Sequence, residues 1–282
     1  MSQTRIAWLV ARLRRRWRWS LLLLALLVGV GFLISLNPRA AQLLLRRDTT
    51  WHTIQAEQRW RVGLDPSFPP FEWLDDQGQP QGYDVALAQQ IAQQWGVQVE
   101  FIAIGYDSLL DALRTGQVES VVSALPFDER MTEDIAYSPP YFDAGIVLAT
   151  LPQTPITNTA ALHGHLLGVE WGSMGEMEGR KLQRDDTTIQ IQRLDSPAAV
   201  IDALVTAQSV DAILIDHVTL RIAQVNGAKL VTIGPMVESN PYVIAMPRLA
   251  YELHDAVATA LQTLQERGVL TKLETKWFVG VK

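Results

Sequence analysis

Hydrophobic and polar positions alternate along residues 59–282 in a pattern that predicts strands and helices in turn. Short apolar runs rich in Val, Ile and Leu are typical of buried strands, and apolar residues three or four positions apart are typical of helices. Strands are predicted at 60–64, 97–102, 118–125, 166–171, 188–194, 210–215, 229–234 and 241–246. Helices are predicted at 84–96, 106–116, 173–184, 196–208, 216–227, about 247–267 and in a short segment ending near Trp277. This alternation favours an α/β fold with parallel sheets covered on both faces.

The pattern divides into two α/β units, which we expect to form two lobes. We expect lobe 1 at 59–148, lobe 2 at 149–238, and a return to lobe 1 over 239–282. If the final helices pack on the first unit, the chain passes between the lobes twice. No internal repeat and no low-complexity tract interrupts the pattern.

The N-terminal region has a different pattern. Residues 19–36, WSLLLLALLVGVGFLISL, carry no charge and as a helix would extend about 27 Å, close to the thickness of a membrane core. Arginines before this run favour a cytoplasmic segment 1–18, a transmembrane anchor at 19–36 and a linker at 37–58. A cleaved signal peptide is the alternative. Both interpretations place the body of the protein on the extracytoplasmic face, periplasmic or outer.

Charge separates the same two regions. Residues 1–47 contain nine Arg and no acid, whereas the rest of the chain holds the other 15 basic residues and all 30 acids, a net charge of −15. An acidic body without a basic stripe argues against a nucleic-acid partner. Cysteine is absent, which excludes a disulfide, a thiolate metal site and a lipidated cysteine.

Candidate binding residues lie in the loops that follow the predicted strands, because ligands of open α/β sheets bind beyond the carboxyl ends of the strands. The first of these loops, DPSFPPFEW at 65–73, is stiffened by three prolines. We expect Phe68 to face outward and Phe71 and Trp73 to pack in the core. Asp65 is either a turn former or a residue that selects ligand charge.

The later loops offer aromatic, hydroxyl and charged groups, each with an ordinary structural alternative. Tyr106 either contacts a ligand or covers the sheet edge at a helix start. The guanidinium group of Arg130 suits a carboxylate, but an arginine among four acids more often forms a solvated ion pair. Ser173 and Asp216 stand at predicted helix starts, where N-capping is the default role. Capping is also the role predicted for Asp84.

Enzyme and metal signatures are absent from the sequence: there is no GxSxG, Walker A, HExxH or GxGxxG motif. His163 and His165 lie close together but no third ligand lies near them in sequence, and His217 beside Asp216 is isolated in the same way. We therefore expect no metal and no cofactor.

Six stretches in order, from RVGLDPSFPPFEWLDDQGQPQGYDVALAQQIA through YDSLLDALRTGQVESVVSAL, DIAYSPPYFDAG, LLGVEWGSMGE and VDAILIDHV to LQERGVLTKLETKWF, carry a resemblance to a known family. Residues 59–282 resemble the family 3 extracellular solute-binding proteins, the amino-acid-binding proteins of ABC importers. The resemblance implies a type II periplasmic-binding-protein-like α/β fold, with two lobes, a ligand cleft between them and hinge closure. It also implies a small-molecule ligand, ABC permease subunits as partners, and a monomer.

The resemblance further implies roles for individual residues. Phe68 and Tyr106 match the aromatic positions that sandwich the ligand, and Ser123 matches a strand-end position that contacts its α-amino or carboxylate group. The Met174 N–H matches a carboxylate donor, and Asp216 matches the acid that pairs with the α-ammonium group. The ligand-binding residues expected from the loops and the resemblance together are Asp65, Phe68, Tyr106, Ser123, Ala124, Arg130, Glu170, Ser173, Met174 and Asp216.

Two positions depart from the family pattern. The family usually has Ser or Thr three residues after Ser123, where this chain has Pro126, which donates no hydrogen bond. The column of the carboxylate-binding arginine holds Met131, and Arg130 precedes it by one residue. The predicted function is capture of a small polar solute, an amino acid by the resemblance, for an ABC importer. The alternatives are a cyclohexadienyl or arogenate dehydratase-like enzyme on the same fold, with Glu170 as general acid, and a ligand-sensing ectodomain.

Overall fold

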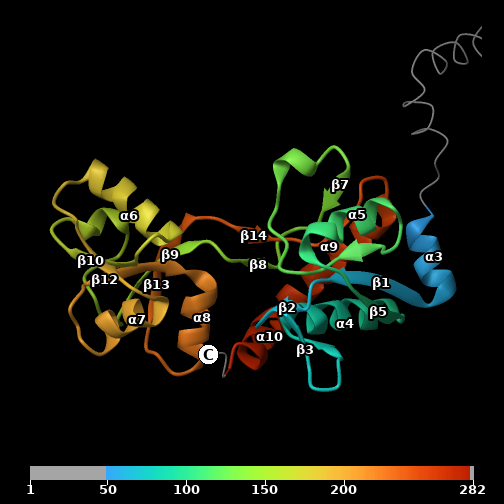
Figure 1. Cartoon of the computed structure of the whole chain (residues 1–282), viewed down its shortest axis with the longest axis horizontal. Coiled ribbons are helices and arrows are strands. Elements are labelled where there is room, and N and C mark those ends of the chain that lie inside the picture. The colour runs from blue at the N-terminus through green and yellow to red at the C-terminus, as the bar shows by residue number, and fades with distance from the viewer. Residues whose placement is uncertain (1–48, 280–282) are drawn as a thin grey trace, which may run out of the picture. The chain divides into compact units, whose positions relative to one another are not determined.

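The computed structural model describes residues 49–279, which form two α/β lobes, each built on a five-stranded sheet (Figure 1). The predicted segments 1–18 and 19–36 and most of the predicted linker lie outside the described residues. Within the described part of the chain, no helix is long and apolar enough to cross a membrane.

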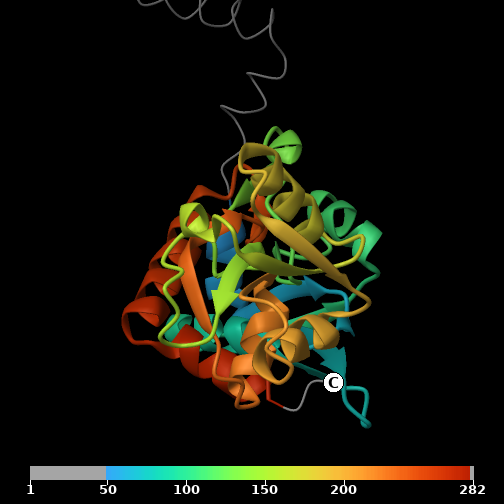
Figure 2. The same ribbon diagram turned by 90° about the vertical axis from the view of Figure 1, so that its left-hand side faces the viewer.

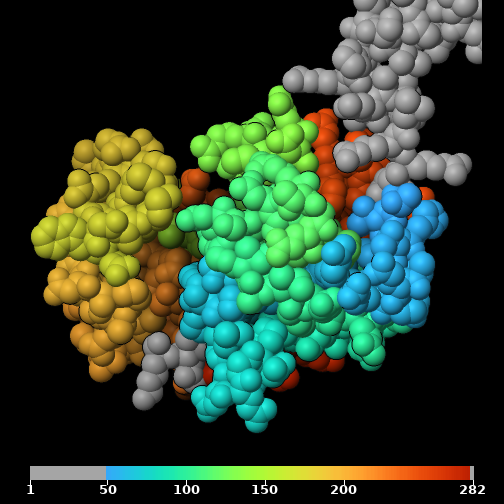
Figure 3. All heavy atoms as spheres, turned by 45° about the vertical axis from the view of Figure 1, so that its right-hand side comes forward, coloured from blue at the N-terminus to red at the C-terminus, as the bar shows by residue number. Residues whose placement is uncertain are grey.

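The first lobe contains the sheet ordered β5-β1-β6-β15-β7, five helices and a three-stranded sheet, β2-β3-β4. The strands of the main sheet are β1 (Arg59–Leu64), β5 (Gln98–Ala103), β6 (Ser120–Val121), β7 (Ile135–Tyr137) and β15 (Ala245–Pro247). The helices are α3 (Thr50–Glu57), α4 (Tyr83–Trp95), α5 (Leu109–Arg114), α9 (Tyr251–Glu266) and α10 (Val269–Trp277). The small sheet comprises β2 (Ser67–Phe68), β3 (Glu72–Leu74) and β4 (Pro80–Gln81). Figure 3 shows the segment with these short strands, in cyan, projecting from the surface.

The second lobe contains the sheet ordered β11-β10-β12-β9-β13 between helices on its two faces. Its strands are β9 (Ile146–Thr150), β10 (Leu166–Glu170), β11 (Gln190–Leu194), β12 (Ala212–Asp216) and β13 (Val231–Glu238). Its helices are α6 (Met174–Asp185), α7 (Pro197–Val205) and α8 (His217–Val225). Figure 2 looks onto this lobe, with α6 on one side of the sheet and α7 and α8 on the other.

Alternation along the central strands explains this three-layer arrangement. In β9 and β12, Val147 and Ile213 pack with the helices α7 and α8, whereas Leu148 and Leu214 pack with the α6 side. Strand side chains point to opposite faces in turn, so a strand buried on both faces must be apolar throughout. The run AILI in β12 meets that requirement.

Two paired strands connect the lobes. β8 (Phe142–Asp143) and β14 (Pro241–Tyr242) run antiparallel beside each other between the two main sheets (Figure 1). After β14 the chain enters the first sheet as β15, and α9 and α10 then pack beside α4. The predicted boundary after residue 148 falls within β9, and the one after residue 238 falls at the end of β13.

The sheets were predicted to be parallel, and both are mixed: β1, β5 and β6, and likewise β10, β11 and β12, do pair in parallel. β9 pairs antiparallel with β12 and β13, and β15 pairs antiparallel with β6 and β7. A continuous apolar run fits a buried strand of either direction, so the pattern did not fix the pairing. The predicted strand 118–125 is also shorter, since only Ser120–Val121 forms β6.

Candidate ligand-binding site

A cavity of about 320 Å³ opens on the first lobe at the carboxyl ends of its parallel strands β1, β5 and β6. It is lined by Asp65, Ser67, Phe68, Glu72, Tyr106, Ser123, Ala124, Pro126 and Tyr242. Three of these residues are aromatic, two are carboxylic acids and none is basic. The cavity therefore combines apolar rings with hydrogen-bond acceptors.

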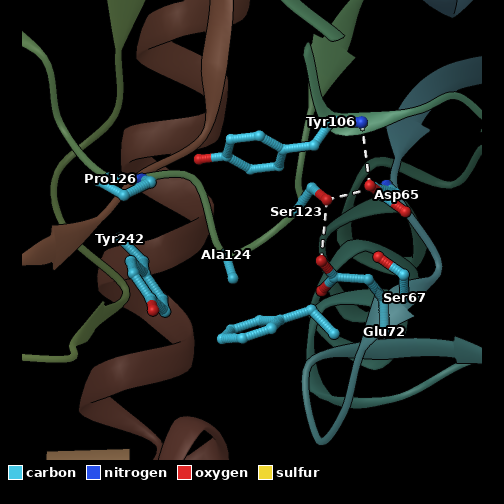
Figure 4. A pocket seen from close by; sticks show the side chains of 9 residues that line it. Asp65, Ser67, Glu72, Tyr106, Ser123, Ala124, Pro126 and Tyr242 are labelled. Carbon is cyan, nitrogen blue, oxygen red and sulfur yellow. Dashed lines mark hydrogen bonds between the residues drawn. The ribbon is translucent and has the colours of Figure 1, made fainter. Parts of the chain in front are cut away.

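The Ser123 hydroxyl joins the loops that form this cavity. It accepts a hydrogen bond from the Asp65 N–H at 2.9 Å and donates one to Oε1 of Glu72 at 2.8 Å (Figure 4). The Tyr106 N–H donates to Oδ2 of Asp65 at 2.9 Å. The loops after three separate strands are thus joined to one another by hydrogen bonds within the protein.

Two carboxyl groups lie together beneath the cavity. Glu72 is 1% exposed and Asp84 is fully buried. The Asp84 carboxylate accepts hydrogen bonds from the Ala124 N–H and from the Tyr141 hydroxyl, the latter at 2.8 Å. Among the described residues, neither Oε2 of Glu72 nor Oδ1 of Asp84 has a donor. The two side chains are hydrogen-bonded to each other, so a proton held by one of them is donated to the other.

Burial places that proton on Glu72. Loss of solvation, together with the smaller effect of the Asp84 charge, raises the pKa of Glu72 to about 11, against the opposing effect of the hydrogen bond from Ser123. Burial also raises the pKa of Asp84, to about 6, against the opposing effect of its hydrogen bonds from Ala124 and Tyr141. At neutral pH Asp84 is therefore the ionised member of the pair and Glu72 the neutral one.

The predicted N-capping role of Asp84 was wrong. The N-cap of α4 is Gly82, and Asp84 lies inside the first turn with its side chain directed to Ala124 and Tyr141. The N–H groups at the helix start donate instead to the carbonyls of Pro70 and Phe71. The 65–73 loop thus supplies the cap with its backbone, which frees the carboxylate to bind the loop after β6.

The position of Phe68 depends on the ring behind it. Phe68 is 47% exposed and stacks on the buried Phe71 with 5.8 Å between ring centroids. Phe71 in turn meets the rings of Tyr83, Phe142, Tyr242 and Phe278 edge-on. The sequence prediction for these two rings is confirmed, whereas Trp73 is only half-buried and packs edge-on against Trp277.

A second cavity, of about 560 Å³, opens on the second lobe. It is lined by Ala144, Gly145, Ile146, Glu170, Ser173, Met174, Gly175, Leu214, Ile215, Asp216, Glu238, Ser239 and Asn240. Three of these residues are acids and none is basic. The start of α6 lies at this cavity because Gly175 packs on the backbone of β12, where a Cβ atom would stand 2.6 Å from the Leu214 carbonyl oxygen.

Both predicted capping residues of the second lobe do cap helices. The Ser173 hydroxyl accepts from the Glu176 N–H at 3.1 Å, while Glu176 accepts from the Gly172 N–H at 2.8 Å. Asp216 accepts from the Thr219 N–H at 2.8 Å. One carboxylate oxygen of Asp216 is used in the cap, so the other stays open to a cation.

Comparison with known proteins identifies the family. Residues 60–280 match the family described as "Bacterial extracellular solute-binding proteins, family 3". The chain belongs to this family. It is 25% identical over 233 residues to the arginine-binding extracellular protein ArtP of Bacillus subtilis, covering 78% of this chain and 86% of ArtP. It is also 25% identical over 232 residues to the histidine-binding periplasmic protein of Salmonella typhimurium, covering 78% and 88% of the two chains.

A solved structure supports the architecture of this family. The substrate-binding protein of a polar amino acid ABC uptake transporter from Streptococcus thermophilus matches with a TM-score of 0.70 at 21% identity, covering 82% of this chain and 90% of that one. The described chain has the two-lobed α/β fold of type II periplasmic binding proteins. The family and the curated relatives are solute-binding proteins without enzymatic activity, so the chain is not assigned as an enzyme.

The structure gathers nine of the ten expected residues at the two cavities. Those at the first cavity are Asp65, Phe68, Tyr106, Ser123 and Ala124, and those at the second are Glu170, Ser173, Met174 and Asp216. Arg130 lines neither cavity. Its side chain is 86% exposed, and its guanidinium group binds the carboxylate of Asp128 at 2.7 Å.

The lining residues that the sequence analysis did not name as candidates include Glu72, Tyr242, Glu238 and Asn240. Glu72 stands between Phe71 and Trp73, and a polar residue between two apolar ones is typical of a strand position that faces solvent. The sequence pattern therefore did not indicate that Glu72 is buried. Tyr242 and Asn240 come from the second crossing between lobes. No local signal marks that segment, because its position depends on the pairing of β14 with β8.

Proposed function

We propose that this protein captures a small amine-bearing solute, an amino acid as in its relatives, and presents it to the permease of an ABC importer. The observation that carries the proposal is the pair of cavities, one on each lobe, lined by rings and carboxylates at strand ends. Membership of a family of extracellular solute-binding proteins supports an extracytoplasmic location. ArtP and the histidine-binding protein are named for amino-acid ligands.

In the proposed mechanism the solute first meets the first lobe. Phe68 and Tyr106 contact its apolar part, and Asp65 accepts from its ammonium group. The lobes then close about the paired segments β8 and β14, and the second lobe adds Asp216, Glu170 and the Met174 N–H. Because the first-lobe loops are already joined by the Ser123 hydroxyl, little ordering is needed on binding.

We further propose that residues 19–36 anchor the chain, with 1–18 in the cytoplasm and 37–58 as a linker. The lobes are proposed as 59–148 and 149–238, with 239–282 returning to the first. A monomer suffices for this mechanism, because each chain has both cavities.

Calorimetry of the full-length chain in detergent, against the common amino acids and simple amines, tests the proposed function. Binding of at least one of these solutes at micromolar concentration is expected, with a release of heat that disappears in Asp216→Ala. Absence of binding by every amino acid and amine at millimolar concentration would contradict the proposal. Cell fractionation, with the chain tagged at its C terminus, tests whether it stays with the membrane.

A further inference from the structure

The charged side chains that line the two cavities are all acidic. Among residues 49–279, no Lys, Arg or His lines either cavity, whereas five acids do: Asp65, Glu72, Glu170, Asp216 and Glu238. Glu72 holds a proton at neutral pH, which leaves four acidic groups without a neutralising partner in the lining. A charge of this sign favours a cation and repels an anion.

Three hydrogen-bond donors of the first-lobe loop after β6 are already used within the protein. The Ser123 hydroxyl donates to Glu72, the Ala124 N–H to Asp84 and the Phe127 N–H to the Pro241 carbonyl. Pro126 has no N–H to donate. Since Ser123 also accepts from the Asp65 N–H, only one lone pair of its hydroxyl remains, and that lone pair accepts rather than donates.

The arginines near these loops are occupied elsewhere. Arg130 points to solvent and binds Asp128 through both Nε and Nη2. In the second lobe, Arg180 and Arg193 both bind the carboxylate of Glu176. The same carboxylate accepts the Gly172 N–H.

The aromatic groups of the first cavity suit an organic cation. Phe68 and Tyr106 are each 47% exposed, and Tyr242 lines the cavity beside them. Figure 4 shows the side chains of Tyr106 and Tyr242 with Ser123 and Asp65 in the same cavity. The face of an aromatic ring attracts an ammonium or guanidinium group, and Asp65 supplies the counter-charge.

We propose that the solute is an organic amine whose recognition requires no carboxylate: a diamine, a polyamine or a guanidino-amine. This inference deepens the proposed function and rests on it. Phe68 and Tyr106 hold the apolar part and Asp65 one cationic end. Asp216 and Glu170 receive the other cationic end from the second lobe.

Two matched pairs of solutes test the proposal with the full-length chain in detergent. Cadaverine is lysine without its carboxylate, and agmatine is arginine without its carboxylate. Calorimetry is expected to give at least tenfold tighter binding for the decarboxylated member of each pair. Equal binding, or tighter binding of the amino acid, would overturn the inference and leave the proposed function intact. Failure of all four solutes and of every common amino acid to bind would overturn both.

Variants assign the effect to residues. Asp65→Asn keeps the shape of the side chain and its acceptor for the Tyr106 N–H. This variant is expected to bind cadaverine at least tenfold more weakly than the parent. Arg130→Ala is expected to change affinity for either member of a pair less than twofold. A tenfold loss of affinity for lysine in Arg130→Ala would show that the Arg130 guanidinium group binds the carboxylate of the solute. This result would contradict the proposal. Circular dichroism of each variant verifies that it is folded.

Discussion

At the scale of single residues, the shared proton beneath the first-lobe cavity controls how the loops are held. Glu72 accepts from Ser123 and shares a proton with Asp84, while Asp84 accepts from Ala124 and Tyr141. The buried pair thus carries one negative charge surrounded by donors, which is a far smaller desolvation cost than two charges.

Glu72→Gln tests where the proton lies. The glutamine amide accepts from Ser123 with its oxygen and donates to Asp84 with its nitrogen, so it reproduces the protonated acid. Between pH 4.5 and about 11 the folded parent holds a proton on Glu72 that the unfolded chain has lost, so its stability falls as pH rises. Glutamine does not titrate, so the variant lacks this loss of stability with pH. The difference in unfolding free energy between variant and parent should therefore increase with pH, by at most about 1.4 kcal/mol per pH unit.

Urea unfolding at a series of pH values from 5 to 8 measures that difference. Glu133→Gln, a change at an exposed glutamate, is the matched control and should run parallel to the parent. A Glu72→Gln variant whose stability relative to the parent is independent of pH would refute the proton assignment.

Asp84→Asn should destabilise the protein, in contrast to Glu72→Gln. The carboxylate of Asp84 accepts hydrogen bonds through both oxygens, from Ala124, Tyr141 and Glu72. An asparagine amide has only one acceptor oxygen, and its NH2 group would face one of these donors without forming a hydrogen bond. We expect a loss of about 1–3 kcal/mol in unfolding free energy, measured by urea unfolding at pH 7. Stability equal to that of the parent would mean that Asp84 is already neutral in the folded protein.

At the scale of elements, the junction between the 65–73 loop and α4 depends on a glycine. Gly82 has φ of +132°, and a Cβ atom there would stand 2.1 Å from the Phe71 carbonyl oxygen. Gly82→Ala should therefore lower the unfolding free energy by about 2–4 kcal/mol, since the backbone must move and α4 loses its loop cap.

Thermal unfolding of the Gly82→Ala variant measures this loss, and Gly78→Ala is the control variant. Gly78 also has positive φ, at +74°, but nothing lies within 4 Å of its Cβ position. Its substitution should cost about 1 kcal/mol from backbone strain alone. Equal losses in the two variants would show that contact with Phe71 contributes nothing at Gly82.

Elements with a local signal were predicted well, and those decided by distant partners were not. Ser173 and Asp216 cap the helices predicted for them, because a cap is a contact within four residues. Asp84 has the same local signal, but a loop from elsewhere caps its helix and leaves its carboxylate for Ala124. Candidate cavity residues were found mainly at strand ends. The contribution of Glu72 and Tyr242 depends on packing and strand pairing that no sequence window contains.

At the scale of the whole molecule, α8 connects the second lobe to the final helix of the chain. Arg221 of α8 donates through Nε to Glu274 of α10 at 2.8 Å, with side chains 22% and 17% exposed. Val218 and Ile222 of the same helix pack against the core of the first lobe. The ion pair is therefore shielded from solvent and joins segments far apart in sequence.

A double-mutant cycle with Arg221→Ala and Glu274→Ala should give a coupling of about 1–3 kcal/mol in unfolding free energy. The exposed pair of Arg59 and Glu57, with side chains 47% and 48% exposed, is the control and should couple by under about 0.5 kcal/mol. If the double variant loses only the sum of the unfolding free energies lost by the two single variants, the contact between α8 and α10 depends on apolar packing alone.

The first and last helices of the described chain, α3 and α10, both pack within the first lobe. This arrangement affects biosensor design, because fluorescent proteins attached directly before α3 and directly after α10 would both be fixed to the first lobe and would keep their separation when solute binds. One fluorophore must instead be inserted in the second lobe. The turn at Gly227, between α8 and β13, has nothing within 4 Å of its Cβ position and is a suitable insertion point.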